Sequence, residues 1–252
     1  MSNFENANAP VPASAKSPRT WDFMETTLVS LLAYGAFALT TGLVLIILVL
    51  AHYGINLPSE AEFERSAMGG RWQGATLILG SPAAIIVLWV AIRMAGREFS
   101  EYLALNWPSS GELVRAFAIT AVILIGEGYF RAFVGADNTS LVPYLNVQGP
   151  GGLLILLIGG CIAAPIMEEF IVRGFMFRGW SQSFLGPVGA IVLTSVVWAM
   201  NHTQYGWSER LCIFVVGLAL GYFRWRSSST WLTVIVHSAI NIVSFFLMGP
   251  YV

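Results

Sequence analysis

Two adjacent glutamates and an arginine lie inside an apolar stretch of this sequence. Residues 152–167 are almost wholly apolar, and the run then reads Glu168-Glu169-Phe-Ile-Val-Arg173 before it becomes apolar again. A charged side chain at the centre of a membrane-spanning helix costs roughly 2.5–3.5 kcal/mol. Charged residues at such depth usually mark a substrate pathway, a proton relay or a binding site, so these three are the first candidates for chemistry.

Helix geometry gives the two glutamates different neighbours. At roughly 100° per residue, Glu169 and Arg173 share a face, whereas Glu168 points about 140° away from Arg173. We therefore expect Arg173 to pair with Glu169, which leaves Glu168 to face another group. A carboxylate in an apolar cavity is a stronger base than in water and can take a proton from a water molecule. An ion pair that only holds helices together is the alternative.

Two histidine motifs follow in later apolar stretches. The run Trp198-Ala-Met-Asn-His202 ends one stretch, and His237-Ser-Ala-Ile-Asn241 lies well inside another. The members of each pair are four residues apart and share a helix face. Histidine and asparagine side chains can both donate hydrogen bonds. The structural alternatives are an interfacial position for His202 and interhelical hydrogen bonds from His237 and Asn241.

Composition places these motifs in a membrane. Hydrophobic residues make up 56% of the 252 and charged residues 11%, whereas a soluble domain carries about 25% charged residues. Several stretches approach or exceed the ~20 apolar residues that cross a bilayer. We therefore predict an all-α, polytopic bundle of about seven spans, with an eighth as the alternative because a short helix fits in 55–72 or 98–106. The expected spans are 27–51, 74–95, 113–134, 151–178, 187–205, 209–226 and 229–249.

The remaining features set the expected organisation. Residues 1–25 are polar and lack the apolar core of a secretory signal, so we expect a disordered cytoplasmic tail before one transmembrane domain, 26–252. A net charge of −1 without a basic stripe argues against a nucleic-acid partner. Cys161 and Cys212 have no Cys or His beside them at metal spacing. Glu127 and Arg131, also four residues apart, are expected to form a structural ion pair.

Basic residues predict the orientation of the bundle, because they collect on the cytoplasmic side of membrane proteins. If the N-terminus is inside, the outer side receives only Arg65, Arg71 and Arg210. The inner side then receives Lys16, Arg19, Arg93, Arg97, Arg115, Arg178, Arg224 and Arg226. We therefore expect a multi-pass protein of the bacterial inner membrane with a cytoplasmic N-terminus.

Together, the three motifs resemble the signature of the CPBP family. This family comprises CAAX prenyl endopeptidases and bacterial Abi proteins and is also called the glutamic intramembrane proteases. Its signature is Glu-Glu-x-x-x-Arg, then Phe-x-x-x-His, then His-x-x-x-Asn, and the resemblance covers about residues 150–245. The one departure is Trp198 at the Phe position, which we expect to change the shape of the cavity more than its chemistry.

The resemblance implies a role for each matched residue. Glu168 would be the general base that activates a water molecule, and His202 would help to hold or deprotonate that water. His237 and Asn241 would stabilise the oxyanion of the tetrahedral intermediate. The supporting residues would be Glu169, Arg173 and Trp198. The implied reaction is hydrolysis of a peptide bond in a lipidated or membrane-embedded substrate, without cofactor or metal, in a cavity expected to open to the inner leaflet.

Three other functions fit parts of the pattern. Glu168, His202 and His237 could form a two-histidine, one-carboxylate zinc site, although the sequence has no His-Glu-x-x-His. The same motifs could serve a bacteriocin-immunity or scaffolding protein without catalysis. Intramembrane glutamate, histidine and arginine also build the proton relays of transporters, but no inverted repeat is visible in the sequence.

Overall fold

The computed structural model of the protein describes residues 19–56, 58–67, 69–135 and 149–248. Within these ranges the chain forms helices and no strand, which confirms the predicted all-α class. Most of the expected tail, residues 1–18, lies outside the described residues. The last few residues of the expected tail are structured, because Asp22 caps the helix that begins at Phe23.

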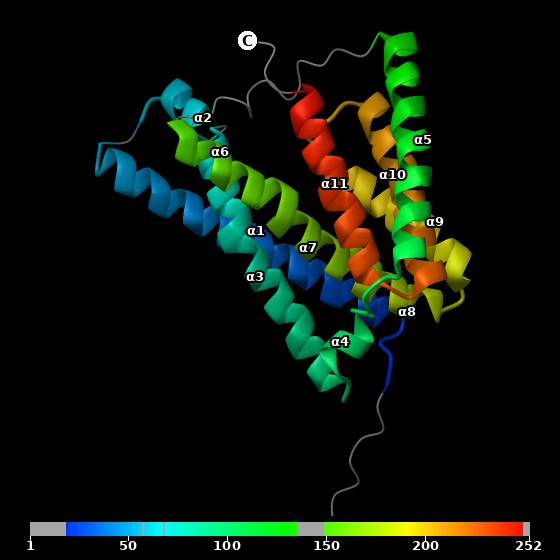
Figure 1. Ribbon diagram of the computed structural model, residues 1–252. Helices are drawn as coiled ribbons and strands as arrows, with labels where there is room; N and C mark the ends of the chain where they lie inside the picture. The colour runs from blue at the N-terminus through cyan, green and yellow to red at the C-terminus, as the bar shows by residue number, and fades with distance from the viewer. Residues whose placement is uncertain (1–18, 57, 68, 136–148, 249–252) are drawn as a thin grey trace, which may run out of the picture.

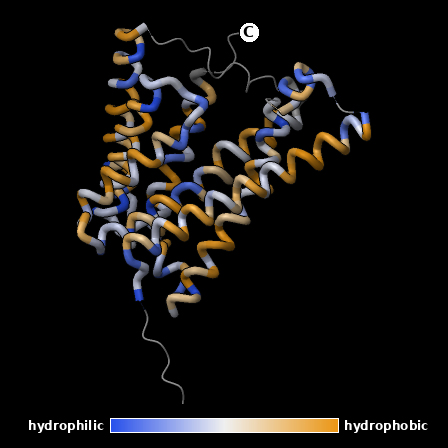
Figure 2. The backbone as a smooth tube through the Cα atoms, turned by 180° about the vertical axis from the view of Figure 1, so that it is seen from behind, coloured by the Kyte–Doolittle hydropathy of each residue, from blue (hydrophilic) through white to orange (hydrophobic). Residues whose placement is uncertain are grey.

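Helices occupy all seven positions at which spans were expected. Among the described residues, four are long and apolar enough to cross a membrane: α1 (Phe23–Tyr53), α3 (Gly70–Met94), α5 (Ser110–Val134) and a helical run over Gly151–Ser181. Shorter helices at the other three positions are α9 (Gly186–Asn201), α10 (Trp207–Ser227) and α11 (Thr230–Met248). The connectors in which a short helix was expected hold α2 (Glu60–Ala67) and α4 (Phe99–Tyr102). Hydrophobic residues run along most of these helices (Figure 2).

Two groups of helices make up the bundle (Figure 1). In one group α1 packs on α3, and α3 packs on the beginning of the 149–181 run. In the other group α10 packs against α5, α9 and α11. The 149–181 run contacts both groups, and its residues Met167, Phe170 and Phe175 belong to the buried core. The run that carries the glutamate pair is therefore the central helix of the protein.

Helix α9 ends earlier than expected. The sequence predicted a span to residue 205, but α9 stops at Asn201 and His202 is the first residue beyond it, with ψ of 60°. Polar residues and Gly206 follow, and they favour a turn over a continued helix. His202 therefore leaves the helix face that it was expected to share with Trp198, although the two rings remain in contact.

Basic residues gather at one end of the bundle, here called the arginine-rich end: Arg19, Arg93, Arg97, Arg115, Arg178, Arg224 and Arg226. The backbone of residue 19 bonds to that of Ala95, and Glu101 accepts hydrogen bonds from Arg97 and Arg178. The Arg97 bond, with help from Arg178, lowers the pKa of the Glu101 carboxyl below its usual value. The connector at Asn106 bonds to Ser228 beyond α10. These contacts tie four chain segments together at this end.

Two glycines allow the central run to touch α3. A Cβ atom on Gly159 would lie 2.6 Å from Cα of Gly74, and one on Gly74 would lie 2.3 Å from the carbonyl oxygen of Ile155. No side chain fits at either position. Small residues at such crossings let membrane helices approach closely, where packing replaces the missing hydrophobic driving force.

We predict that Gly159→Ala destabilises the protein. The added methyl group must push α3 away from the central run, and overpacking of this kind costs about 1–3 kcal/mol. Unfolding in detergent measures the loss. The control is Gly160→Ala, because a Cβ there meets nothing within 4 Å. Equal stability of the two variants would show that the crossing tolerates separation.

Candidate active site

The glutamate pair lies between two widened turns of the central run. This run consists of α6 (Gly149–Ile158), η2 (Gly159–Ala163), α7 (Ala164–Glu169), η3 (Phe170–Met176) and α8 (Phe177–Ser181), of which η2 and η3 are π-helical. Pro165 has no amide donor for a regular helical bond, consistent with the wide turn before it. π-helical turns occur frequently at functional sites, and here they flank Glu168 and Glu169.

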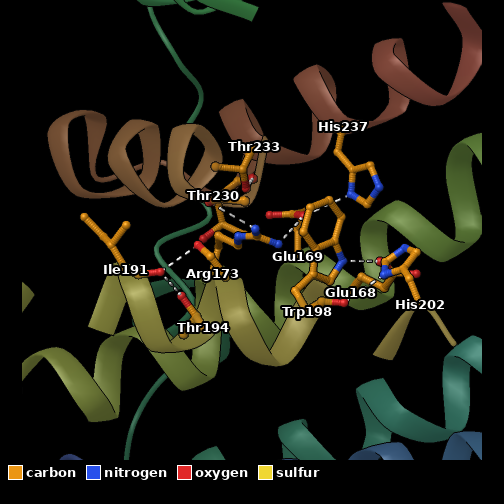
Figure 3. A network of polar contacts seen from close by, with 12 residues as sticks. Glu168, Glu169, Arg173, Ile191, Thr194, Trp198, His202, Thr230, Thr233 and His237 are labelled. Carbon is orange, nitrogen blue, oxygen red and sulfur yellow. Dashed lines mark hydrogen bonds and ion pairs between the residues drawn. The ribbon is translucent and has the colours of Figure 1, made fainter. Parts of the chain in front are cut away.

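Glu169 is the centre of a buried polar network (Figure 3). Arg173 donates from Nη1 to Glu169 Oε1 at 2.9 Å, and neither side chain has any solvent exposure. The same oxygen lies 3.0 Å from Nδ1 of His237 on α11. Arg173 also donates to the carbonyl oxygen of Gly217 on α10 at 3.3 Å. The expected pairing of Glu169 with Arg173 is confirmed, and it joins three helices.

Trp198 connects the two halves of the site. Its indole Nε1 donates to Glu168 Oε2 at 2.6 Å, and Arg173 lies over its ring at 4.5 Å from the centroid. The rings of His202 and His237 both meet the indole edge-on, with centroids 5.1 Å away. A phenylalanine could not donate to Glu168. Trp198 therefore changes the polar contacts of the site, beyond the change of shape that the sequence suggested.

Backbone carbonyls orient His202 and Asn241. His202 Nδ1 lies 2.8 Å from the carbonyl oxygen of Trp198. A carbonyl can only accept, so Nδ1 carries the proton and Nε2 has the lone pair of the neutral ring. Asn241 donates from Nδ2 to the carbonyl oxygen of Gly160 at 2.8 Å, which leaves its second N–H for another acceptor. That carbonyl belongs to the widened turn η2.

His237 is oriented by a carboxylate. Its Nδ1 faces Glu169, which accepts the hydrogen bond when ionised. The Nε2 atom on the other side of the ring donates a hydrogen bond only when the ring carries its second proton. This contact places His237 on α11 at the same depth as Glu169 on the central run.

A cavity of about 130 Å³ adjoins these side chains. Its wall contains Trp198, His202, His237 and Asn241. Glu168 is not among the lining residues and meets the wall through the indole of Trp198. The structure thus brings every residue of the three sequence motifs into one connected site, with the proposed base directly behind the cavity wall.

Residues 150–243 match the sequence profile of the type II CAAX prenyl endopeptidase Rce1-like family. This segment of the chain is Rce1-like. The match confirms the resemblance seen in the three motifs, and at the level of the family it supports a CAAX-type protease of the membrane. Searches of curated proteins and of solved structures found no match to the chain.

The cavity wall also contains charged residues, of which Glu127 and Arg131 lie outside the Rce1-like segment. Arg131 on α5 lies 3.8 Å from Glu127 and 3.8 Å from Glu209 on α10, and all three line the cavity. The sequence predicted the Glu127–Arg131 pair as structural. It carried no signal for Glu209, which meets Arg131 only because α5 packs against α10.

Tyr34 on α1 is another residue that the sequence did not single out. Its hydroxyl is buried, and the side chains of Asn201 and Glu168 lie near it. Like Glu127 and Arg131, Tyr34 lies outside the Rce1-like segment, so the first helix adds a polar group near Glu168.

The cavity lies in the half of the bundle opposite the arginine-rich end. It reaches Tyr205 in the α9–α10 connector, Glu209 in the first turn of α10 and Ser244 near the end of α11. In the orientation predicted from the basic residues, this is the outer half. The expected orientation and the expected opening to the inner leaflet therefore do not fit together, and both stay predictions. The number of residues between a side chain and the end of its helix indicates how deep that side chain lies. It does not indicate at which end of the bundle the helices leave room for a cavity.

The placement of possible metal ligands bears on the zinc alternative. Across the described ranges, no group of three His, Cys, Asp or Glu side chains is placed to hold a metal ion. Glu168, His202 and His237 are thus not recorded as such a group within these ranges, and chelation before an activity assay is the test of the zinc alternative.

We predict that the two glutamates of the Rce1-like segment differ in their effect on stability. Glu169→Gln leaves Arg173 buried without a counter-charge, which costs about 3–5 kcal/mol. Glu168→Gln is the matched control, since it makes the same chemical change one residue away and should cost about 1 kcal/mol or less. Denaturant unfolding of the purified variants measures both. Similar losses for the two would contradict the division of roles.

Proposed function

We propose that the protein is an intramembrane endopeptidase that hydrolyses a peptide bond of a membrane-associated substrate with a water molecule activated by Glu168. The supporting observation is the unequal environment of the two acids. Glu169 is engaged by Arg173 and His237, whereas Glu168 has the neutral indole N–H of Trp198 as its hydrogen-bond donor. A carboxylate without a cationic partner beside it suits proton transfer better than one held in an ion pair.

In the proposed reaction, Glu168 takes a proton from water while the water oxygen bonds to the scissile carbonyl carbon. The carbonyl π electrons move to oxygen and form a tetrahedral oxyanion. His202 accepts a hydrogen bond from the water through Nε2, the ring atom that its contact with the Trp198 carbonyl leaves unprotonated. Glu168 then returns the proton to the leaving nitrogen as the C–N bond breaks, and a carboxylic acid and an amine are released.

His237 and Asn241 are the proposed oxyanion donors. Both line the cavity from α11, and each is held by a second contact, to Glu169 and to the Gly160 carbonyl respectively. Donors that are fixed before the reaction do not have to reorganise when charge develops, and one such donor contributes about 10²–10³-fold to the rate. The mechanism needs no metal ion or other cofactor, which exhaustive chelation before the assay would check.

The first test of this function is Glu168→Gln. Glutamine keeps the size of the side chain and can accept from Trp198, but it cannot take a proton from water. We expect turnover of a quenched, lipid-anchored peptide by the purified protein to fall at least 10³-fold, within the range that loss of a catalytic base produces. Wild-type turnover by Glu168→Gln would rule out Glu168 as the base.

Full turnover by the unsubstituted protein after chelation would rule out zinc.

A second test replaces Trp198 by the phenylalanine of the family signature. Trp198→Phe keeps an aromatic ring under Arg173 but removes the N–H donor to Glu168. Because a hydrogen bond to a charged group contributes about 1.5–3 kcal/mol, we expect a loss of stability of that size, with turnover retained within about tenfold. Trp198→Leu, which also removes the ring, is the comparison. If Trp198→Phe were as inactive as Glu168→Gln, the indole N–H would take part in the reaction itself.

A further inference from the structure

A second cavity, of about 350 Å³, lies at the arginine-rich end of the bundle. Its walls are the first turns of α5, the last turns of α10 and the start of α11. A volume of this size falls within the range of small-molecule binding pockets. The lining residues that the structure describes include no member of the three sequence motifs. The proposed reaction therefore gives this cavity no role.

The charged residues of this cavity suit a ligand with one negative charge. Arg115 lines it from α5 and Arg226 from α10. Within the described ranges, neither guanidinium forms a hydrogen bond or an ion pair. Glu112 also lines the cavity, but its Oε2 already accepts from the backbone N and the Oγ of Ser109, at 2.8 and 2.7 Å, as part of the cap of α5. Two arginines and one glutamate leave a net charge of +1 on the wall.

The wall becomes apolar about one turn deeper in the bundle. On α5, Ile119 lines the cavity four residues after Arg115. On α10, which runs in the opposite direction, Phe223 lines it three residues before Arg226. Leu232 closes the wall from the beginning of α11. The cavity therefore has a cationic side next to the helix ends and a hydrocarbon side next to the middle of the bundle.

Tryptophans at the same helix ends indicate the depth of the cationic side. Trp107, in the connector before α5, stacks on Trp231 in the first turn of α11, with ring centroids 5.6 Å apart. Trp225, next to Arg226 on α10, is 41% exposed. Tryptophan is enriched at the level of the lipid head groups. The arginines of the cavity thus lie at head-group depth, and its apolar side lies at the depth of the acyl chains.

We propose that this cavity binds a phospholipid of net charge −1, with its phosphodiester group between Arg115 and Arg226 and the beginning of an acyl chain against Ile119 and Phe223. Guanidinium groups match phosphate oxygens with two parallel hydrogen bonds. Basic pockets between membrane helices bind anionic head groups for this reason. Free phosphate offers the same oxygens but has no chain for the apolar side. A zwitterionic head group brings a positive charge close to the two arginines.

Thermal unfolding of the full chain tests the proposal. The protein is washed free of lipid in a neutral detergent, and its Tm is measured with phosphatidylglycerol, with phosphatidylcholine of the same acyl chains, and with sodium phosphate. A ligand that binds only the folded state raises Tm. We expect phosphatidylglycerol near saturation to raise Tm by about 5 °C. We expect phosphatidylcholine and sodium phosphate each to raise it by less than about 2 °C.

Three arginine variants locate the effect. Arg115→Gln and Arg226→Gln should each reduce the shift caused by phosphatidylglycerol at least twofold, because each removes one of the two phosphate donors. Arg93→Gln is the matched control: Arg93 lies at the same end, outside the cavity, and pairs with Glu98 at 2.7 Å. It should keep the full shift. Each shift is measured from the lipid-free Tm of the same variant, so a change in basal stability does not affect the comparison.

Four results would overturn the proposal. An equal loss of shift in Arg93→Gln and Arg115→Gln would indicate attraction by the whole basic end without a site. An equal shift with phosphatidylcholine would show that the charge of the head group is not recognised, and an equal shift with sodium phosphate would show an anion site without a lipid. No shift with phosphatidylglycerol would show that it does not bind. None of these results depends on Glu168, so the proposed protease activity stands or falls separately.

Discussion

The contact of one carboxylate oxygen of Glu169 with both Arg173 and His237 is the constraint on which the rest of the structure depends. Removing ionised groups from water costs several kcal/mol each unless close partners compensate. Here the compensation comes from the central run, from α11 and, through the Gly217 carbonyl, from α10. These three helices cannot shift relative to one another without exposing a buried charge. The position of His237, and with it the wall of the cavity, follows from this contact.

Much of this core could be predicted from the sequence because it depends on local spacing. The i, i+4 relation of Glu169 and Arg173 determines their pairing in any helical turn of this kind, and long apolar stretches locate the helices. The histidine motifs were found by the rarity of polar residues in apolar stretches. In each case, the residues that carry the pattern lie within a few positions of the helix or side chain whose placement they predict.

Contacts between distant segments could not be predicted in this way. The Gly160 carbonyl that Asn241 meets is available in a widened turn, and nothing in the local sequence marks it as a partner. Glu209 and Tyr34 reach the site because α10 and α1 pack beside it. The end of α9 at Asn201 depends on the turn that follows. The side on which the cavity opens depends on how all the helices separate, which no single stretch encodes.

Helix α5 is held much more weakly than its neighbours. Of its residues, Ala116 and Thr120 are the buried ones, and one polar link to α10 near the cavity is the 3.8 Å contact of Arg131 with Glu209. Helix α11, by contrast, is anchored through His237 and Asn241. A polypeptide that moves sideways out of the lipid must push a pair of helices apart to reach the cavity. Displacing α5 would break the contact of Arg131 with Glu209 but would leave the fully buried network of Glu169, Arg173 and His237 intact, so a path between α5 and α11 disturbs the site least.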